Sequence, residues 1–251
     1  MGIDVNRANR QVCDLDIRVL KTKQPYLFFD TANTTTVGIS GDAVYAMAKG
    51  SRRIAFPNPM EGTLSVECQV YPFKFYSLFS DGVIDTEAIY YTTQTVKCET
   101  AGEIALTIPE TGTIVPGTVF AFPAESFGDE TTLIEGTFAE GKFTATTTEN
   151  IAADTEYKIG YAINRTGVKK VAFNNKKQPR DYFITMSTLE KDEEGVFTPF
   201  LITAYKATIQ RNFELSFSSE GDPATITATF DLMEDKDGNI LDFVELTDDA
   251  Q

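Results

Sequence analysis

The sequence contains no histidine and no tryptophan, and only three of its 251 residues are cysteine. Without histidine the chain lacks the side chain that titrates near neutral pH, which excludes the common catalytic triads and most zinc sites. The phosphate-binding patterns GxxxxGK[ST] and GxGxxG are also absent. We therefore predict that the protein is not an enzyme, with no catalytic, cofactor-binding or metal-ligating residues and no cofactor. Carboxylate pairs of the glycosidase type are the one catalytic arrangement that the composition still allows.

Long hydrophobic runs are missing as well. No apolar stretch approaches the roughly 18 residues that a membrane helix needs, and residues 1–7 lack the apolar centre of a signal peptide. We expect a soluble protein, made in a cytoplasm, with no membrane partner. Cys13, Cys68 and Cys98 have no CxxC spacing, so free or buried thiols are favoured, and a disulfide between subunits stays open.

Basic residues are scarce, with 22 Lys and Arg against 37 Asp and Glu, which gives a net charge of −15. The excess is uneven, because residues 1–97 hold ten acids and ten bases whereas residues 190–251 hold fifteen acids and four bases. A protein that grips nucleic acid through its phosphates needs clustered bases. The charge therefore argues against nucleic-acid binding, and acidic surface is also an ordinary means of solubility.

What the sequence does have is two-residue alternation towards its C-terminal end, which is typical of half-buried strands. Residues 201–217 predict one long strand, and residues 224–232 predict a second strand after a turn at Gly221, Asp222 and Pro223. A third strand is expected over 240–244, after a turn at 235–239. The first strand is expected to point these side chains inward: Leu201, Thr203, Tyr205, Ala207, Ile209, Phe213, Leu215 and Phe217.

The rest of the chain predicts more strands and one helix. A hairpin is expected over residues 43–56, turned around the basic tip 49–53, and a short helix over 73–79 follows Pro72. Residues 103–164 contain strand-like runs about every ten residues, which suggests an inserted all-β module. A basic loop follows at 169–180, and a hairpin turn at 192–195. We predict an N-terminal arm (1–13), a β core (14–102 and 165–251) and the module (103–164).

Three segments are characteristic of this order of elements: Gly50-Ser51-Arg52-Arg53-Ile54-Ala55-Phe56, Gly62-Thr63-Leu64-Ser65-Val66 running into residues 71–79, and Phe213-Glu214-Leu215-Ser216-Phe217 through the turns at 221–223 and 237–238. In these segments and in the order of its elements, the chain resembles the major tail tube proteins of tailed bacteriophages, over about residues 14–98 and 167–246. The resemblance implies a mainly β fold, an antiparallel β-sandwich or barrel with one short helix. It also implies that six subunits close into a ring, and that rings stack into a tube that carries the phage genome.

The resemblance further implies where subunits meet and what lines the channel. The hairpin over 38–56 and the arm 1–13 become interface candidates, with Lys49, Ser51, Arg52, Arg53 and Ile54 at their centre. Channel-lining candidates are the outward row Lys206, Thr208, Gln210, Asn212 and Glu214, or the alternative row from Thr225 to Asp231. Carboxylates in the channel would repel DNA phosphates, so that the genome passes without specific binding.

The implied partners are further copies of the chain and other tail proteins, namely a sheath if the tail contracts, a terminator and a baseplate. The implied location is the tail of the virion, after assembly in the host cytoplasm. The alternative is an Ig-like binding module or a capsid decoration protein, for which β modules and acidity are equally natural.

Overall fold

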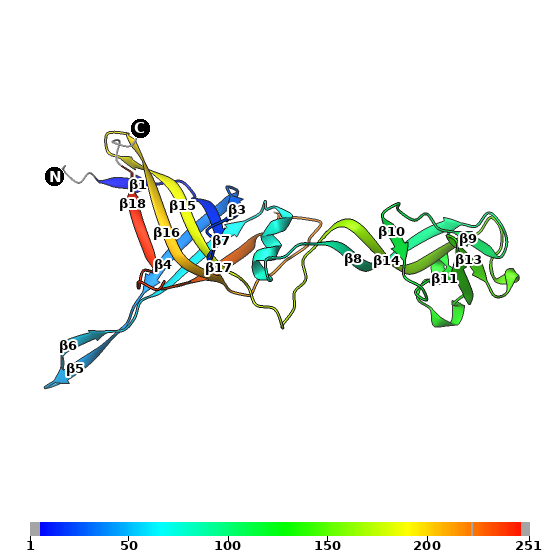
Figure 1. The fold of residues 1–251 in the computed structure, drawn as a ribbon, viewed down its shortest axis with the longest axis horizontal. Helices are drawn as coiled ribbons and strands as arrows, with labels where there is room; N and C mark the ends of the chain where they lie inside the picture. Colours follow the sequence, from blue (N-terminus) through cyan, green and yellow to red (C-terminus); the bar gives the residue numbers. More distant parts are fainter. Residues whose placement is uncertain (1–5, 222, 247–251) are drawn as a thin grey trace. The chain divides into compact units, whose positions relative to one another are not determined.

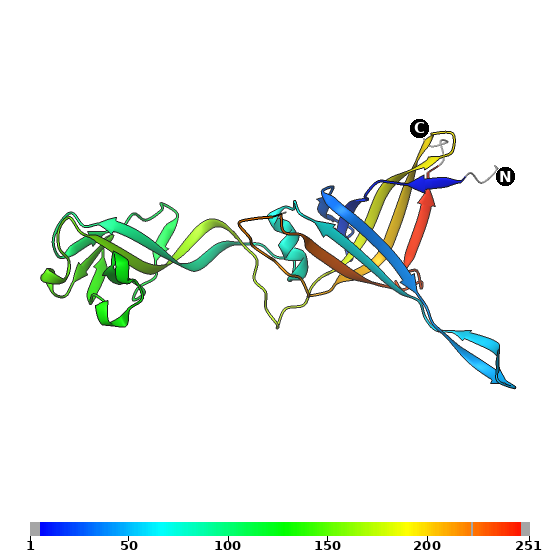
Figure 2. The same ribbon diagram turned by 180° about the vertical axis from the view of Figure 1, so that it is seen from behind.

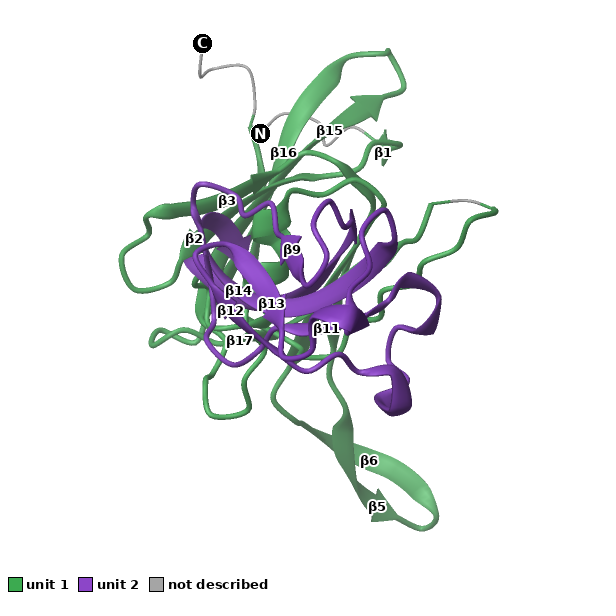
Figure 3. Ribbon diagram, turned by 90° about the vertical axis from the view of Figure 1, so that its right-hand side faces the viewer, with its two compact units in different colours: residues 1–83, 171–251 green, residues 84–170 purple. Residues whose placement is uncertain are grey.

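The computed structural model describes residues 6–221 and 223–246. The chain forms two compact units, which Figure 3 colours separately: unit 1 comprises residues 1–83 and 171–251, and unit 2 comprises residues 84–170. Unit 2 is longer at both ends than the module predicted over 103–164. The reason is that residues 85–97, which fall in the predicted β core (14–102), pair with residues 156–170 inside unit 2.

Unit 1 is built on an antiparallel nine-stranded sheet (Figure 1). Its main path runs β3-β2-β15-β16-β17-β7-β4, while β1 pairs with β15 and β18 pairs with β16. A separate two-stranded sheet, β5-β6, lies between β4 and β7 in the sequence. The strands of unit 1 are β1 (Arg7–Asn9), β2 (Asp14–Val19), β3 (Pro25–Phe29), β4 (Ala32–Ser40), β5 (Ala43–Ala48), β6 (Ser51–Pro57), β7 (Glu61–Cys68), β15 (Asp181–Asp192), β16 (Phe197–Ile209), β17 (Ile226–Met233) and β18 (Leu241–Glu245).

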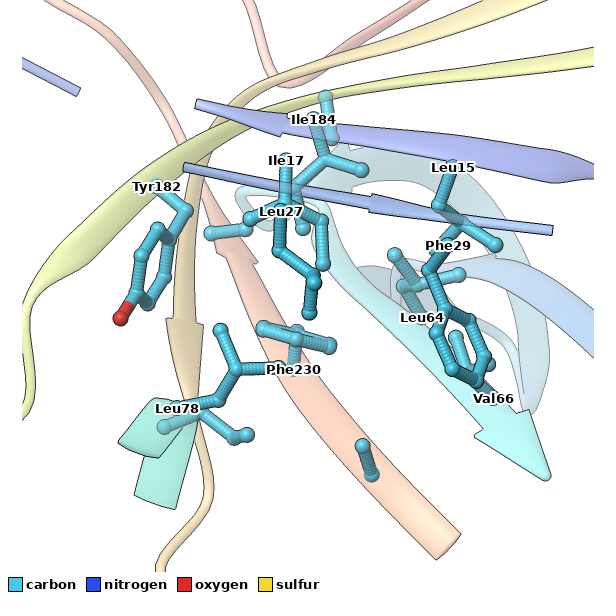
Figure 4. Close-up of a cluster of buried hydrophobic side chains, with 14 of the residues drawn as sticks. Leu15, Ile17, Leu27, Phe29, Leu64, Val66, Leu78, Tyr182, Ile184 and Phe230 are labelled. Atoms are coloured by element: carbon cyan, nitrogen blue, oxygen red, sulfur yellow. The ribbon is translucent and has the colours of Figure 1, made fainter. Parts of the chain in front are cut away.

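One face of the nine-stranded sheet forms the core of unit 1, because alternate residues of its strands are apolar. On β15 the buried apolar residues are Tyr182, Ile184 and Met186, and β17 buries Phe230 in the same way. Figure 4 shows Tyr182, Ile184 and Phe230 converging with side chains of β2, β3 and β7. The labelled residues are Leu15, Ile17, Leu27, Phe29, Leu64, Val66, Leu78, Tyr182, Ile184 and Phe230.

The helix predicted over residues 73–79 is confirmed as the 3₁₀ helix η1 (Phe73–Phe79). Pro72 precedes it in an extended conformation, and the helix buries Phe75, Leu78 and Phe79 in the core of unit 1. Its buried Ser77 hydroxyl donates to the carbonyl of Lys74 at 2.5 Å. The aromatic face of this segment is therefore part of the core rather than a ligand site.

A β-bulge in β16 corrects the predicted alternation. Tyr182 of β15 pairs with Ala207 and Ile184 pairs with Ala204, so β16 has one extra residue in this interval. The inward residues are therefore Ile202 and Ala204 before the bulge, and Ala207 and Ile209 after it. Ala207 and Ile209 confirm the prediction. Three residues predicted to point inward, Leu201, Thr203 and Tyr205, lie on the opposite face.

The strand predicted over residues 201–217 ends earlier, because β16 stops at Ile209. Its predicted continuation through residues 213–217 is therefore wrong. Phe213 instead packs beside the rings of Phe79 and Phe173, with centroids at 4.6 and 5.4 Å. The next predicted strand is confirmed as β17, which buries alternate residues from Ile226 to Leu232. Of the turn predicted at 221–223, residue 222 lies outside the described residues, as do residues 1–5 of the predicted arm.

Unit 2 has its own core and two small sheets in antiparallel pairing, one of four strands and one of three. Its longest strands, β8 and β14, pair with one another. Buried residues include Ile104, Phe143, Ile151 and Ile159. Its elements are β8 (Asp85–Lys97), β9 (Glu103–Ala105), β10 (Gly112–Ile114), β11 (Phe120–Pro123), β12 (Gly136–Ala139), β13 (Lys142–Ala145), β14 (Glu156–Lys170) and the single 3₁₀ turns η2 (Ala124–Ser126), η3 (Glu130–Thr132) and η4 (Thr148–Asn150).

Candidate assembly surfaces

The hairpin β5-β6 extends away from the nine-stranded sheet of unit 1 (Figures 1 and 2). Its turn is made by Lys49 and Gly50, whose φ angles are 50° and 79°. Positive φ at both central residues is the requirement of a two-residue type I′ hairpin turn. The tip is thus shorter than the predicted 49–53, because Ser51, Arg52, Arg53 and Ile54 lie in β6.

One face of this hairpin is an exposed apolar strip. Val44 pairs with Phe56 and Ala46 pairs with Ile54, so all four side chains point to the same side. The exposed fractions of Val44, Ile54 and Phe56 are 60%, 57% and 57%. We name these four residues the apolar strip. Of the predicted interface residues only Ile54 belongs to it, and the alternation of residues 44, 46, 54 and 56 is the sequence signal that could have identified the others.

The opposite face of the hairpin is more polar. A bulge between Ala46 and Met47 places Met47 opposite Arg52. The guanidinium of Arg52 lies over the ring of Tyr45, 4.2 Å from its centroid. Arg52 therefore lies on the side of the hairpin opposite the apolar strip, together with Tyr45 and Met47.

Only part of the predicted channel-lining row lies along a strand. Lys206 and Thr208 lie on the face of β16 opposite the core, as predicted. Gln210 follows the strand directly, and its amide donates to Asp231 Oδ1 at 2.7 Å. Asn212 and Glu214 lie outside any strand, so they do not continue the row.

The two alternative channel-lining rows lie on a single face of the sheet. Thr208 of β16 pairs with Asp231 of β17, and paired residues of antiparallel strands point to the same side. Thr227 and Thr229 continue on β17, and Thr229 pairs with Ser65 of β7. Thr225 precedes β17. The two rows, which the sequence left as alternatives, therefore belong to the same face of the sheet.

This shared face, which we name the outer face, is rich in hydroxyl and carboxylate groups. In one line across the sheet Asp16 pairs with Thr185, Thr185 with Thr203, and Thr203 with Asp242. The Thr208 hydroxyl donates to Asp181 Oδ1 at 2.5 Å. Cations on this face include Arg18, paired with Asp16, and Lys206. The outer face is thus polar and presents several carboxylates to solvent.

Tyr205 is held on the outer face by a hydrogen bond to Asp242 of β18. This bond is the main cause that raises the pKa of the Tyr205 phenol, with desolvation second. The phenolic O–H donates to an Asp242 carboxylate oxygen, and this interaction favours the neutral phenol. The contact links β18 to β16 on the polar side.

The thiols do not pair within the chain. Cys68 is buried in the core of unit 1, where burial raises its pKa to about 11. Cys98 is buried in unit 2, and its Sγ contacts the carbonyls of Thr100 and Glu103 at 3.0 and 3.1 Å. Only Cys13 is half-buried, so it is the thiol with access to a neighbouring subunit.

The described residues contain neither a candidate metal cluster nor a candidate membrane helix. Among residues 6–221 and 223–246, no group of three or more His, Cys, Asp or Glu side chains is placed to hold a metal ion. In the same residues, no helix is both long enough and apolar enough to cross a membrane.

Unit 2 carries an aromatic cleft that the sequence did not indicate. Gly160 of β14 lies between Thr93 of β8 and Phe120 of β11, and the Phe127 ring covers it. A Cβ at residue 160 would lie 3.0 Å from that ring, so glycine permits this packing. The cleft has a volume of about 590 Å³ and is lined by Tyr91, Thr92, Thr93, Thr118, Phe120, Phe122, Phe127, Gly128, Gly160 and Tyr161.

Together these features define a mainly β protein in which the β5-β6 hairpin exposes an apolar strip and the nine-stranded sheet has a polar outer face. The comparison with protein families agrees with that class, since the YomU/Tube protein family matches residues 10–245. The chain belongs to this phage-associated tube family. No curated protein matches the chain.

Proposed function

We propose that this protein is the structural subunit of a phage tail tube, in which six copies close into a ring and rings stack around a channel for the genome. Membership of the YomU/Tube family over nearly the whole chain supports a structural role in a phage tube. The proposal adds the hexamer, the stacking and the passage of DNA. It also adds the partners expected at the ends and outside of such a tube: a terminator, a baseplate and, in a contractile tail, a sheath. Assembly would take place in the host cytoplasm.

The observation that carries this proposal is the apolar strip of the β5-β6 hairpin. An isolated two-stranded hairpin is only marginally stable in water. Here Val44, Ile54 and Phe56 are each more than half exposed, although large apolar side chains are usually buried. Contiguous exposed apolar surface of this kind marks protein interaction sites. A neighbouring subunit that covers the strip would supply the missing packing.

The outer face supports the assignment of the channel lining. Its threonines and serines offer no positive charge to phosphate groups, and Asp16, Asp181, Asp231 and Asp242 lie among them. We propose that this face lines the lumen and that its carboxylates repel DNA phosphates. A structure of the assembled ring with this face outside and a basic lumen would refute that assignment.

The direct test is negative-stain microscopy of the concentrated purified protein. Tubes or six-fold rings are expected. Persistent monomers at high concentration, with a folded β spectrum by circular dichroism, would contradict the proposal.

A matched pair of variants tests the role of the apolar strip. Phe56→Asp places a charge in the strip, whereas Ala55→Asp places the same charge on the other side of the same hairpin. We expect Phe56→Asp to abolish assembly and Ala55→Asp to retain more of it, because burying an unpaired carboxylate in an apolar contact is costly. Circular dichroism should be unchanged for both variants. Equal assembly of the two variants would show that the strip is not the contact.

The aromatic cleft favours a second candidate function, that of a binding module of the Ig-like or decoration type, located in unit 2. Exposed rings such as Tyr91, 78% exposed, and Phe120, 48% exposed, beside threonine hydroxyls can stack on and hydrogen-bond a ligand such as a sugar. Glycan-array binding by the full chain that is lost in Tyr91→Ala would support this function. Binding without any ring or tube formation would favour it over the tail tube.

A further inference from the structure

Two oppositely charged regions lie at the two ends of a single strand in unit 1. The segment 171–180, which we name the basic loop, leads into β15, and the segment 190–195, which we name the acidic turn, ends β15 and leads into β16. Figure 1 shows them at opposite ends of the sheet. β15 has 12 residues and so spans roughly 40 Å at about 3.3 Å per residue. The two regions of one chain therefore cannot contact each other.

The basic loop is an organised cation cluster in a chain of net charge −15. It carries Lys176, Lys177 and Arg180 and no acidic residue. A fourth cation, Arg211, is fixed to it, since its Nη2 donates to the carbonyls of Asn174 and Lys177 at 3.0 and 2.9 Å.

Contacts with residues 81 and 82 further order the loop. Arg180 Nε donates to the carbonyl of Asp81 at 2.7 Å, and its side chain packs where a Cβ on Gly82 would otherwise lie. The carboxylate of Asp81 forms an ion pair with Lys177 at 2.6 Å. The four cations thus outnumber the carboxylates of Asp81 and of Asp181, which directly follows Arg180, and the cluster keeps a net positive charge. Lys176 is exposed.

The acidic turn is the complementary end. It contains Glu190, Asp192, Glu193 and Glu194, with Lys191 as its one base. The neighbouring strand β1 adds Arg7, which is ion-paired with Glu245, and Arg10 follows that strand, so this end keeps an excess of acids over bases. Asp192 holds the turn through a bond that its Oδ1 accepts from the backbone N–H of Val196 at 2.8 Å. Glu193 and Glu194 are exposed at its tip. An exposed aromatic residue lies at each end of the strand: Phe173, 55% exposed, in the basic loop and Phe197, 53% exposed, after the acidic turn.

We infer that the basic loop of one copy binds the acidic turn of another copy, head to tail along the direction of β15. A contact between two different patches is heterologous, and when it does not close it generates a filament. Complementary charge fixes the polarity of such a contact, because loop against loop or turn against turn would be repulsive. The inference rests on the proposed tube, to which it adds the contact that stacks one ring on the next.

Charge variants at exposed positions test this contact in the full chain. Lys176→Glu weakens the positive end, and Asn175→Lys, also exposed, strengthens it. Lys142→Glu is the matched control, since it makes the same change of net charge in unit 2, at a surface ion pair with Glu103. The measurement is the critical concentration for tubes, from the fraction that pellets, at about 50 mM and about 500 mM salt, where the Debye length falls from roughly 14 to 4 Å.

For the wild type we expect a higher critical concentration at high salt. At low salt Lys176→Glu should raise it about fivefold and Asn175→Lys should lower it about threefold, while Lys142→Glu should leave it nearly unchanged. Circular dichroism confirms that each variant is folded.

The outcomes separate this inference from the proposed function. Tubes that form with equal critical concentrations for the wild type and Lys176→Glu would overturn the contact and leave the tail tube standing. Equal effects of Lys176→Glu and Lys142→Glu would also overturn it, because only net charge would then matter. A wild-type chain that forms no tubes or rings would overturn both.

Discussion

The strand pairs β5-β6 and β15-β16 are both antiparallel and each places apolar side chains on one face, but the environments of those faces are opposite. In β15 the alternate residues Tyr182, Ile184 and Met186 are fully buried in the core of unit 1, whereas Ile54 of β6 is more than half exposed. The pattern along a strand therefore determines which side chains share a face, but not what packs against that face.

The same difference separates intrachain stability from assembly. Unit 1 closes its core with residues of its own sheet and with η1, so this core is complete in one copy. Among the described residues of unit 1, the hairpin has no such cover. We therefore expect the core strands to govern folding and the hairpin to govern association.

The largest effect expected from this comparison is on stability. Met186→Ala, in the core, should lower the free energy of unfolding of unit 1 by about 2–5 kcal/mol. Ile54→Ala, in the apolar strip, should change it by less than about 0.5 kcal/mol. Urea unfolding of dilute, unassembled protein measures both values, with the fluorescence of tyrosine as the signal. Similar losses in the two variants would show that the hairpin is packed in the free chain.

A second effect is on proteolysis. Trypsin should cut the free chain first at Lys49, Arg52 or Arg53, because a hairpin with little packing opens at low free-energy cost. Cleavage there should be at least about tenfold faster than at Lys206 in the paired strand β16, and assembly should suppress it.

Mass spectrometry of a digestion time course provides the measurement for this second effect. Lys206 serves as the internal reference site in every sample. If Lys206 is cut as early as the hairpin, the contrast between the two strand pairs is lost.

The third and smallest effect is at the tip. Lys49 holds a positive φ of 50°, which is uncommon for lysine and favoured by asparagine before Gly50. Lys49→Asn should therefore stabilise the β5-β6 hairpin by about 0.5 kcal/mol, seen as slower amide exchange in residues 43–57 with no change in β15. Slower exchange in both strand pairs would mean that the hairpin is not an independent element.

The elements predicted correctly from sequence are those with a local cause. η1 follows from Pro72 and the spacing of its apolar residues, and β17 follows from alternation between two turns. The β5-β6 hairpin also forms near its predicted bounds. Each of these signals lies within about ten residues of the element it specifies.

The parts that were missed have causes distant in the sequence. The bulge in β16 arises where β16 must pair with β15, and the extra residue leaves no mark in composition. Residues 213–217 alternate well, yet Phe213 is drawn to Phe79 and Phe173 instead of extending the sheet. The larger extent of unit 2 follows from the pairing of β8 with β14, which lie about 70 residues apart.

From the sequence alone we could predict antiparallel strands. The sequence also shows that histidine is absent, which removes a common catalytic and zinc-binding side chain, and that negative charge is concentrated towards the C-terminal end. These properties depend on composition and on neighbours along the chain. The fold adds that Thr208 and Asp231 share one outer face, and that no described residue of unit 1 covers the apolar strip in the way that the core is covered. Both depend on strand register and on packing between distant segments, which short-range patterns do not encode.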